Sequence, residues 1–170
     1  MKRLMVGILL AVSSSTASAA VTCPDLSTNQ KVVLQKSWKY GEEKVGKGWG
    51  VKLASVAYQE SKLGKDIHGQ GSYGVYQLKP STAAYMNGQK TTKGVRKRLT
   101  NEFQYSAISA AKYLTYWKDK GYSDYNMYRA YNGGYVKNKA TKVYAASVQK
   151  HVHTFKQCYV YNNGVLHERS

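Results

Sequence analysis

The 170-residue sequence is poor in acidic residues, cysteine and proline, and it contains no long apolar run. Two Pro residues exclude a Pro-rich linker protein. No apolar run reaches about 18 residues, so we expect no membrane-spanning helix in the mature protein. A hydrophobic fraction of 42% with 12% aromatic residues excludes a disordered chain. The length predicts one domain built on one core.

The shortage of acidic residues leaves a large positive charge. Nine Asp and Glu stand against 26 Lys and Arg, which gives a formal net charge of +17. Such a surface favours a polyanion as partner: nucleic acid, lipid phosphates or an acidic cell-wall polymer. The densest basic cluster lies in residues 90–98, where binding to such a polymer and solvated loop charge are both open interpretations. Its members are Lys90, Lys93, Arg96, Lys97 and Arg98.

The first 19 residues have the pattern of a cleaved secretory signal peptide. Lys2 and Arg3 precede nine apolar residues (4–12), and residues 17–19, ASA, fit the small-x-small cleavage rule. The alternative is a retained N-terminal anchor. We therefore predict that residues 20–170 form the mature domain and that it is exported to the periplasm or the cell exterior.

Predicted export determines how the two cysteines are interpreted. In an oxidising compartment, Cys23 and Cys158 are most simply a disulfide, and two unrelated buried thiols are the alternative. Two Cys and four His at scattered spacings supply no recognisable ligand set. We expect neither a metal nor another cofactor.

Hydrophobic spacing and helix-end residues predict a mostly α-helical domain with long loops. In the predicted helices, Thr28 caps the first, Gly41 stops it, and Gly64 ends the second. Alternation around Asn163 and Gly164 predicts a small C-terminal β-hairpin over residues 159–166. Residues 66–76 are expected to form a Gly-rich loop or a short hairpin, and residues 87–98 a basic connector. The predicted helices cover residues 28–40, 49–63, 80–86, 101–118, 123–131 and 141–155.

Glu60 continues an apolar stripe of the second predicted helix. Trp49, Leu53, Val56 and Glu60 are spaced +4, +3 and +4 and so share one face. Partial burial and the negative end of the helix dipole both raise the pKa of such a carboxyl group, as a general acid requires. The alternative is a glutamate at the core edge, paired with one of the many Lys or Arg residues.

Three short segments, taken in order, resemble the lytic transglycosylases with a soluble-type (SLT) catalytic domain. They are residues 57–61 (AYQES), 74–83 (GVYQLKPSTA) and 130–134 (AYNGG). The resemblance implies a lysozyme-like α+β fold with a substrate cleft. It departs from the family pattern at Val75-Tyr76, where Leu-Met is usual, and at Gly133, where Ala is usual.

The resemblance implies an activity on the glycan strands of peptidoglycan. Glu60 would be the single acid and base that cleaves the N-acetylmuramic acid–N-acetylglucosamine bond without water and leaves a 1,6-anhydro end. Ser61 would support the acid, and Tyr131 would orient it or touch the muramic ring. Core packing or turn formation is the alternative for several of these side chains. The substrate-binding candidates are Ser61, Gly74, Tyr76, Gln77, Tyr131 and Asn132.

Three other functions remain open from the sequence. If Asp66 faced Glu60 across the cleft, a lysozyme-type hydrolytic muramidase would result. A secreted basic nucleic-acid-binding protein and a wall-binding module without catalysis are the others. We expect peptidoglycan as partner, with acidic wall polymers or lipid phosphates at the basic surface, no specific nucleic acid, and a monomer.

Overall fold

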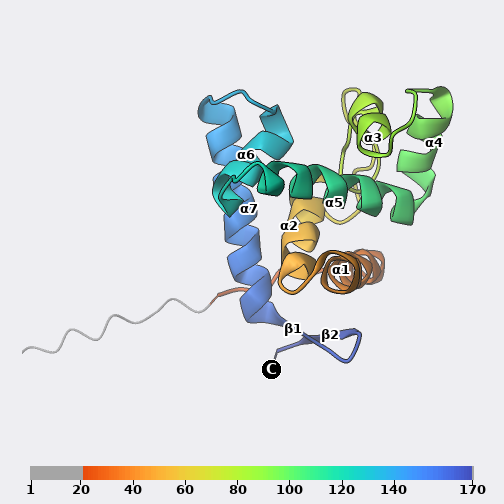
Figure 1. The fold of residues 1–170 in the computed structure, drawn as a ribbon. Coiled ribbons are helices and arrows are strands. Elements are labelled where there is room, and N and C mark those ends of the chain that lie inside the picture. The colour runs from red at the N-terminus through yellow and green to blue at the C-terminus, as the bar shows by residue number, and fades with distance from the viewer. Residues whose placement is uncertain (1–20, 170) are drawn as a thin grey trace, which may run out of the picture.

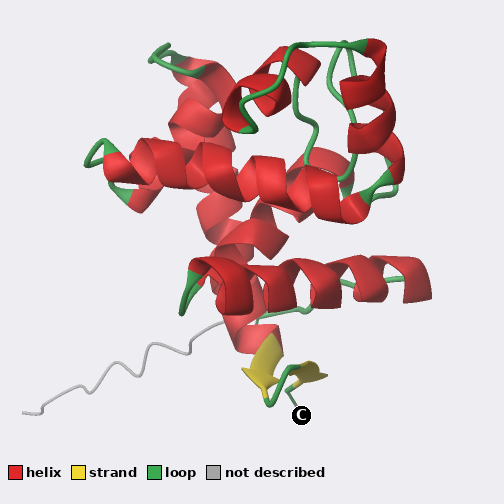
Figure 2. Ribbon diagram, turned by 45° about the vertical axis from the view of Figure 1, so that its right-hand side comes forward, coloured by secondary structure: helices red, strands yellow, loops and turns green. Residues whose placement is uncertain are grey.

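Helices dominate residues 21–169, the part of the chain that this computed structural model describes. Strands occur in this part only in a hairpin at its C-terminal end (Figures 1 and 2). This is the expected α+β lysozyme-like architecture. The predicted signal peptide lies outside the described residues. The elements are α1 (Thr28–Tyr40), η1 (Gly41–Val45), α2 (Trp49–Ser61), α3 (Pro80–Met86), α4 (Lys93–Asn101), α5 (Phe103–Asp119), α6 (Asp124–Gly133), α7 (Lys139–Cys158), β1 (Tyr159–Asn162) and β2 (Val165–Glu168).

The helix α2 lies at the centre of the packing. It contacts α1 on one side and α7 on another, while α5 packs against α3, α4 and α6 (Figure 1). Leu53, Val56 and Ala57 of α2 are at most 1% exposed, as the apolar stripe predicts. No helix in residues 21–169 is both long and apolar enough to cross a membrane. The same residues hold no group of three or more His, Cys, Asp or Glu placed to bind a metal ion.

The start of α2 is fixed by a close approach of two glycines. A Cβ atom on Gly41 would lie 2.6 Å from the Cα of Gly50, so only glycine allows this contact. The Glu42 carboxylate accepts hydrogen bonds of 3.0 Å from the backbone N–H groups of Gly48 and Gly50, which satisfies free donors at the helix start. The helix α1 ends at Tyr40 with Gly41 as its C-cap, as predicted, and the chain continues from Gly41 as the π-helical turn η1. The predicted N-cap is wrong, because Ser27 rather than Thr28 caps α1.

The chain leaves α2 through a tight left-handed turn. Lys62 and Leu63 have φ values of 51° and 58°, followed by Gly64 at 87°. Lys62 is therefore the C-cap, and the predicted end at Gly64 is two residues late. The Leu63 side chain is buried, and its N–H donates to the Ala57 carbonyl at 3.1 Å. Burial of Leu63 offsets the cost of the unusual backbone and fixes the end of the helix.

The basic connector predicted for residues 87–98 is wrong in its second half, which forms α4. Thr92 caps this helix, and Val95 and Leu99, one turn apart, are buried. Basic side chains of α4 also pack: the Arg96 guanidinium lies 4.7 Å from the Tyr73 ring centroid. Short amphipathic helices are easily missed when lysine and arginine fill most of their positions.

The two ends of the described chain are joined near the hairpin. Cys23 and Cys158 form the predicted disulfide, with their Cα atoms 5.6 Å apart. It links the segment before α1 to the last residue of α7. The predicted hairpin is confirmed, and Asn163 and Gly164 both have positive φ, as its two-residue turn requires.

Removing the disulfide should lower stability substantially. It closes a loop of 135 positions, for which the chain-entropy model gives a stabilisation of about 5 kcal/mol. Loss of a native disulfide commonly lowers the free energy of unfolding by about 2–5 kcal/mol. For the double variant Cys23→Ser/Cys158→Ser we expect the melting temperature to fall by about 6–15 °C. Calorimetry of the oxidised protein and the variant measures this, with reduced wild type as the matched control. A change below 2 °C would contradict it.

Candidate active site

The last turn of α2 carries Glu60 into a cleft of about 370 Å³. The cleft lies between the end of α2, the loop before α3, and the helices α5 and α6. Polar and aromatic side chains line it, together with one cation, Lys79. The lining residues are Glu60, Ser72, Gln77, Leu78, Lys79, Thr82, Tyr113, Tyr131, Asn132, Gly133 and Gly134.

Glu60 is the only carboxylate in the cleft lining, and it has no cationic partner. None of the ion pairs found among residues 21–169 includes it, so the alternative of a paired glutamate at the core edge is wrong. Burial raises the pKa of Glu60 to about 7, and a hydrogen bond from Tyr144 partly opposes that rise. The carboxyl group therefore exchanges its proton near neutral pH, as a general acid and base must.

Tyr144 is the functional residue that the sequence analysis missed. Its hydroxyl donates to Oε1 of Glu60 at 2.5 Å, across 84 positions of sequence. Tyr144 lies on α7 and is 8% exposed. The apolar stripe of α7, Val148, Val152 and Phe155, contains a signal for it, because one turn earlier that stripe reaches residue 144. A buried tyrosine on such a stripe needs a partner for its hydroxyl.

A second contact ties the same turn of α2 to α7. Oε1 of Gln59 accepts from the Ser147 hydroxyl and lies 3.0 Å from Nε2 of His151. Burial lowers the pKa of His151 to about 4, so its ring is neutral at physiological pH. Two consecutive residues, Gln59 and Glu60, are thus both held by α7.

Ser61 is buried and lines no part of the cleft, so its expected contact with substrate is wrong. Its hydroxyl donates to the Val75 carbonyl at 2.6 Å and accepts from the Gly64 N–H at 2.8 Å. These bonds join the end of α2 to the loop before α3. Ser61 therefore supports Glu60 by fixing the backbone beside it.

Tyr76 and Gly74 also have structural roles in place of the expected substrate contacts. The Tyr76 ring is fully buried, with its hydroxyl 2.8 Å from Ser37 Oγ, and so it cannot stack on a sugar. A Cβ atom on Gly74 would lie 1.9 Å from the Leu99 carbonyl oxygen. Glycine is needed there because the loop packs against the end of α4, not because a sugar approaches.

Three of the predicted substrate-binding residues do line the cleft: Gln77, Tyr131 and Asn132. The Gln77 amide donates to the Gly74 carbonyl at 2.8 Å, so this side chain also stabilises its loop. The Tyr131 hydroxyl donates to the Tyr76 carbonyl at 2.8 Å rather than to Glu60, and the expected orientation of the acid comes from Tyr144 instead. Asn132 is exposed at the end of α6.

The departure from the family pattern at Gly133 has a steric reason. A Cβ atom at Gly133 would lie 2.5 Å from Cγ2 of Thr141, a buried residue at the start of α7. The Thr141 methyl group occupies the space of the missing side chain. Glycine at position 133 therefore fits the contact between α6 and α7.

Asp66 is exposed and does not line the cleft. Only its backbone oxygen contacts a residue of the cleft lining, 3.3 Å from the Gln77 amide nitrogen. The arrangement with Asp66 facing Glu60, which hydrolysis by two carboxylates requires, is therefore not present.

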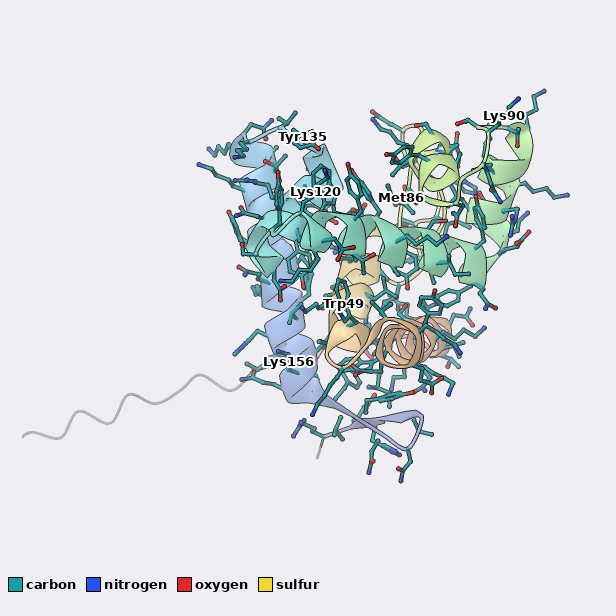
Figure 3. The ribbon with its side chains drawn as sticks, in the orientation of Figure 1. Trp49, Met86, Lys90, Lys120, Tyr135 and Lys156 are labelled. Atoms are coloured by element: carbon teal, nitrogen blue, oxygen red, sulfur yellow. A yellow bond between two sulfur atoms is a disulfide. The ribbon has the colours of Figure 1, made fainter. Side chains whose placement is uncertain are left out.

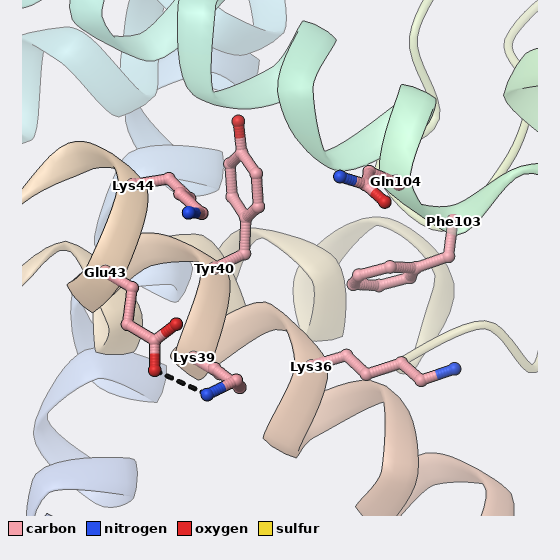
Figure 4. A pocket seen from close by; sticks show the side chains of 7 residues that line it. All are labelled: Lys36, Lys39, Tyr40, Glu43, Lys44, Phe103 and Gln104. Atoms are coloured by element: carbon pink, nitrogen blue, oxygen red, sulfur yellow. Dashed lines mark hydrogen bonds and ion pairs between the residues drawn. The ribbon is translucent and has the colours of Figure 1, made fainter. Parts of the chain in front are cut away.

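A second cavity of about 400 Å³ lies between α1, η1 and the start of α5 and has a different chemistry (Figure 4). Its only carboxylate, Glu43, is paired with Lys39 (Figure 4). The hydrogen bond from Lys39 lowers the pKa of Glu43, so this group is ionised at neutral pH and cannot donate a proton. At neutral pH Glu60 can therefore carry a proton to donate, whereas Glu43 cannot.

The model for the transglycosylase SLT domain matches residues 38–154, more than half of the chain. This range includes Glu60, its partner Tyr144 and the whole cleft lining. Comparisons with curated proteins and with solved structures gave no match.

Glu60 should destabilise the fold at neutral and high pH. Its folded-state pKa of about 7 lies above the ordinary value of 4.5. Stability is therefore lost as pH rises from 4.5 to 7 and stays lower above 7, by about 3 kcal/mol. We expect Glu60→Gln to be more stable than wild type at pH 8, with a gain that disappears below pH 4.5.

Urea unfolding at several pH values measures this difference. The matched control is Glu102→Gln, an exposed glutamate paired with Arg98, for which no such gain at pH 8 is expected. An equal gain from both variants at pH 8 would contradict a raised pKa at Glu60.

Proposed function

Because the chain belongs to the transglycosylase SLT family, we propose that it is a peptidoglycan lytic transglycosylase with Glu60 as its single acid and base. The family supports an activity of the transglycosylase type on peptidoglycan. One observation carries the proposal: the only carboxylate of the cleft lacks a cationic partner and has its pKa raised to about 7.

The first step needs a proton donor. Protonated Glu60 gives its proton to the glycosidic oxygen as the bond from that oxygen to C1 of N-acetylmuramic acid breaks. The acetamido oxygen of the same sugar assists at C1, which removes the need for a second enzyme carboxylate. The cleft supports this, because no other Asp or Glu lines it.

The second step needs a proton acceptor. The ionised Glu60 takes the proton of the muramic acid 6-hydroxyl while that oxygen bonds to C1. The products are a 1,6-anhydro end and a free N-acetylglucosamine 4-hydroxyl. No water is consumed, and the carboxyl group is protonated again for the next cycle.

Tyr144 and Ser61 act as positioning residues. The Tyr144 hydroxyl is 2.5 Å from Glu60 and stabilises the carboxylate between the two steps. Ser61 fixes the turn that follows Glu60 through its bond to Val75. Gln77 and Asn132, in the cleft lining, are placed to contact sugar substituents.

The cellular setting belongs to the same proposal. SLT domains generally act outside the cytoplasm, which agrees with cleavage of residues 1–19, export and a Cys23–Cys158 disulfide. Without Lys2 and Arg3 the mature chain keeps a net charge of +15, which would concentrate a monomeric enzyme on acidic wall polymers or lipid phosphates.

Digestion of purified peptidoglycan tests the reaction directly. We expect mass spectrometry to show fragments with 1,6-anhydromuramic ends, each 18 Da lighter than the hydrolysed fragment, and none from Glu60→Gln. The matched control is Glu43→Gln, which alters the other cavity and should retain activity. Reducing ends made with added water would indicate a hydrolase, and full activity of Glu60→Gln would refute the assignment of the acid.

Tyr144→Phe should change the pH dependence. Since the hydrogen bond from Tyr144 lowers the pKa of Glu60, its loss should move the alkaline limb of kcat/KM upward by about one pH unit. The rate at pH 6 should fall about tenfold as the acid loses its orientation. Tyr128→Phe, another buried tyrosine, is the control. Identical profiles for the two variants would contradict a role for Tyr144.

A further inference from the structure

A groove rich in aromatic residues adjoins the cleft. It has a volume of about 410 Å³ and lies between α3, α5 and the end of α6. Its lining contains no charged side chain. The residues of this aromatic groove are Ser81, Thr82, Tyr85, Met86, Tyr113, Tyr116, Trp117, Gly134 and Tyr135.

The aromatic groove is continuous with the cleft that contains Glu60. Thr82, Tyr113 and Gly134 line both spaces. Figure 3 shows Met86 and Tyr135 on opposite sides of the gap between α3 and α6, and both line the aromatic groove. A polymer that passes Glu60 can therefore extend into the groove without leaving the surface.

Two tyrosines in the aromatic groove are exposed to an unusual degree. Tyr85 is 70% exposed and Tyr135 is 67% exposed. Neighbouring rings hold both: Tyr85 stands edge-on to Tyr116, with centroids 6.5 Å apart, and Tyr135 to Trp117, at 4.9 Å. Paired exposed aromatic rings on a preformed wall are typical of a binding site.

Resting on the function proposed above, we infer that the aromatic groove is a sugar subsite in which Tyr85 and Tyr135 bind a pyranose ring of the glycan strand distant from the cleaved bond. A pyranose has an apolar C–H face and a polar rim. The apolar face matches a tyrosine ring, and the rim matches the hydroxyl groups of Ser81 and Thr82. No charged side chain lines the groove, although the Lys120 ammonium lies beside it, 4.8 Å from the Tyr116 ring centroid. Continuity with the cleft favours the substrate strand as the occupant.

Contact with a remote sugar can accelerate the reaction at Glu60, because the binding energy of that contact helps to hold the strand in the reactive position. The groove therefore predicts a preference for long strands. Short fragments that do not reach Tyr85 and Tyr135 should lose this advantage.

Binding and kinetics together test the subsite. In a Glu60→Gln background, which removes the acid, calorimetry measures binding of β-1,4-linked N-acetylglucosamine oligomers of two to six sugars. Tyr85→Ala and Tyr135→Ala should each weaken binding of the hexamer about 3- to 10-fold and leave the dimer unchanged. Tyr85→Phe and Tyr135→Phe should keep most of the affinity, since they retain the ring. Tyr161→Ala, in the distant hairpin, is the matched control and should have no effect.

In the otherwise wild-type enzyme, the two alanine variants should lower kcat/KM on long glycan strands by the same factor and leave short fragments unaffected. Unchanged hexamer binding in the double variant Tyr85→Ala/Tyr135→Ala would overturn the inference. Sedimentation could instead show that the wild-type protein is a dimer and the double variant a monomer. That result would also overturn the inference and would assign the groove to a second copy of the chain. Since the binding arm needs no catalysis, it stands even if the products prove hydrolytic.

Discussion

The candidate site is built around one carboxyl group placed where its ionisation is unfavourable. Glu60 ends an apolar helix face, and the hydroxyl of Tyr144 is its only hydrogen-bond partner among the described residues. In a chain with 26 Lys and Arg, the lack of a cationic partner is the feature that most needs explanation. A paired glutamate would stay ionised and could not deliver a proton, so chemistry at this position requires the isolation that costs stability.

Much of the surrounding framework holds this carboxyl group in place. The contact between Gly41 and Gly50 sets the start of α2, and the left-handed turn at Lys62 and Leu63 sets its end. On α7, Tyr144 holds Glu60 from the side, while the disulfide anchors the far end of that helix. Precision at the site thus comes from long-range contacts between rigid helices rather than from the cleft loop alone.

The sequence predicted most helices, the hairpin and the face on which Glu60 lies, because each depends on spacing within a few turns. It did not predict features that depend on contacts between residues far apart in the sequence. Tyr144 is 84 positions from Glu60, and the burial of Tyr76 depends on Ser37 of α1. Gly74 was expected to contact substrate, but a required glycine does not reveal which atom approaches it, and here that atom is the Leu99 carbonyl oxygen. The helix α4 was hidden because basic residues mask its two-residue apolar stripe.

Titration of Glu60 itself is the most direct test of its raised pKa. The chain has only five glutamates, so carbon NMR of protein labelled at the glutamate side-chain carboxyl resolves few signals, and Glu60→Gln identifies the one of interest. We predict that this signal titrates with a pKa near 7. A midpoint near 4.5 would show that the carboxyl is an ordinary surface acid and would contradict the central claim.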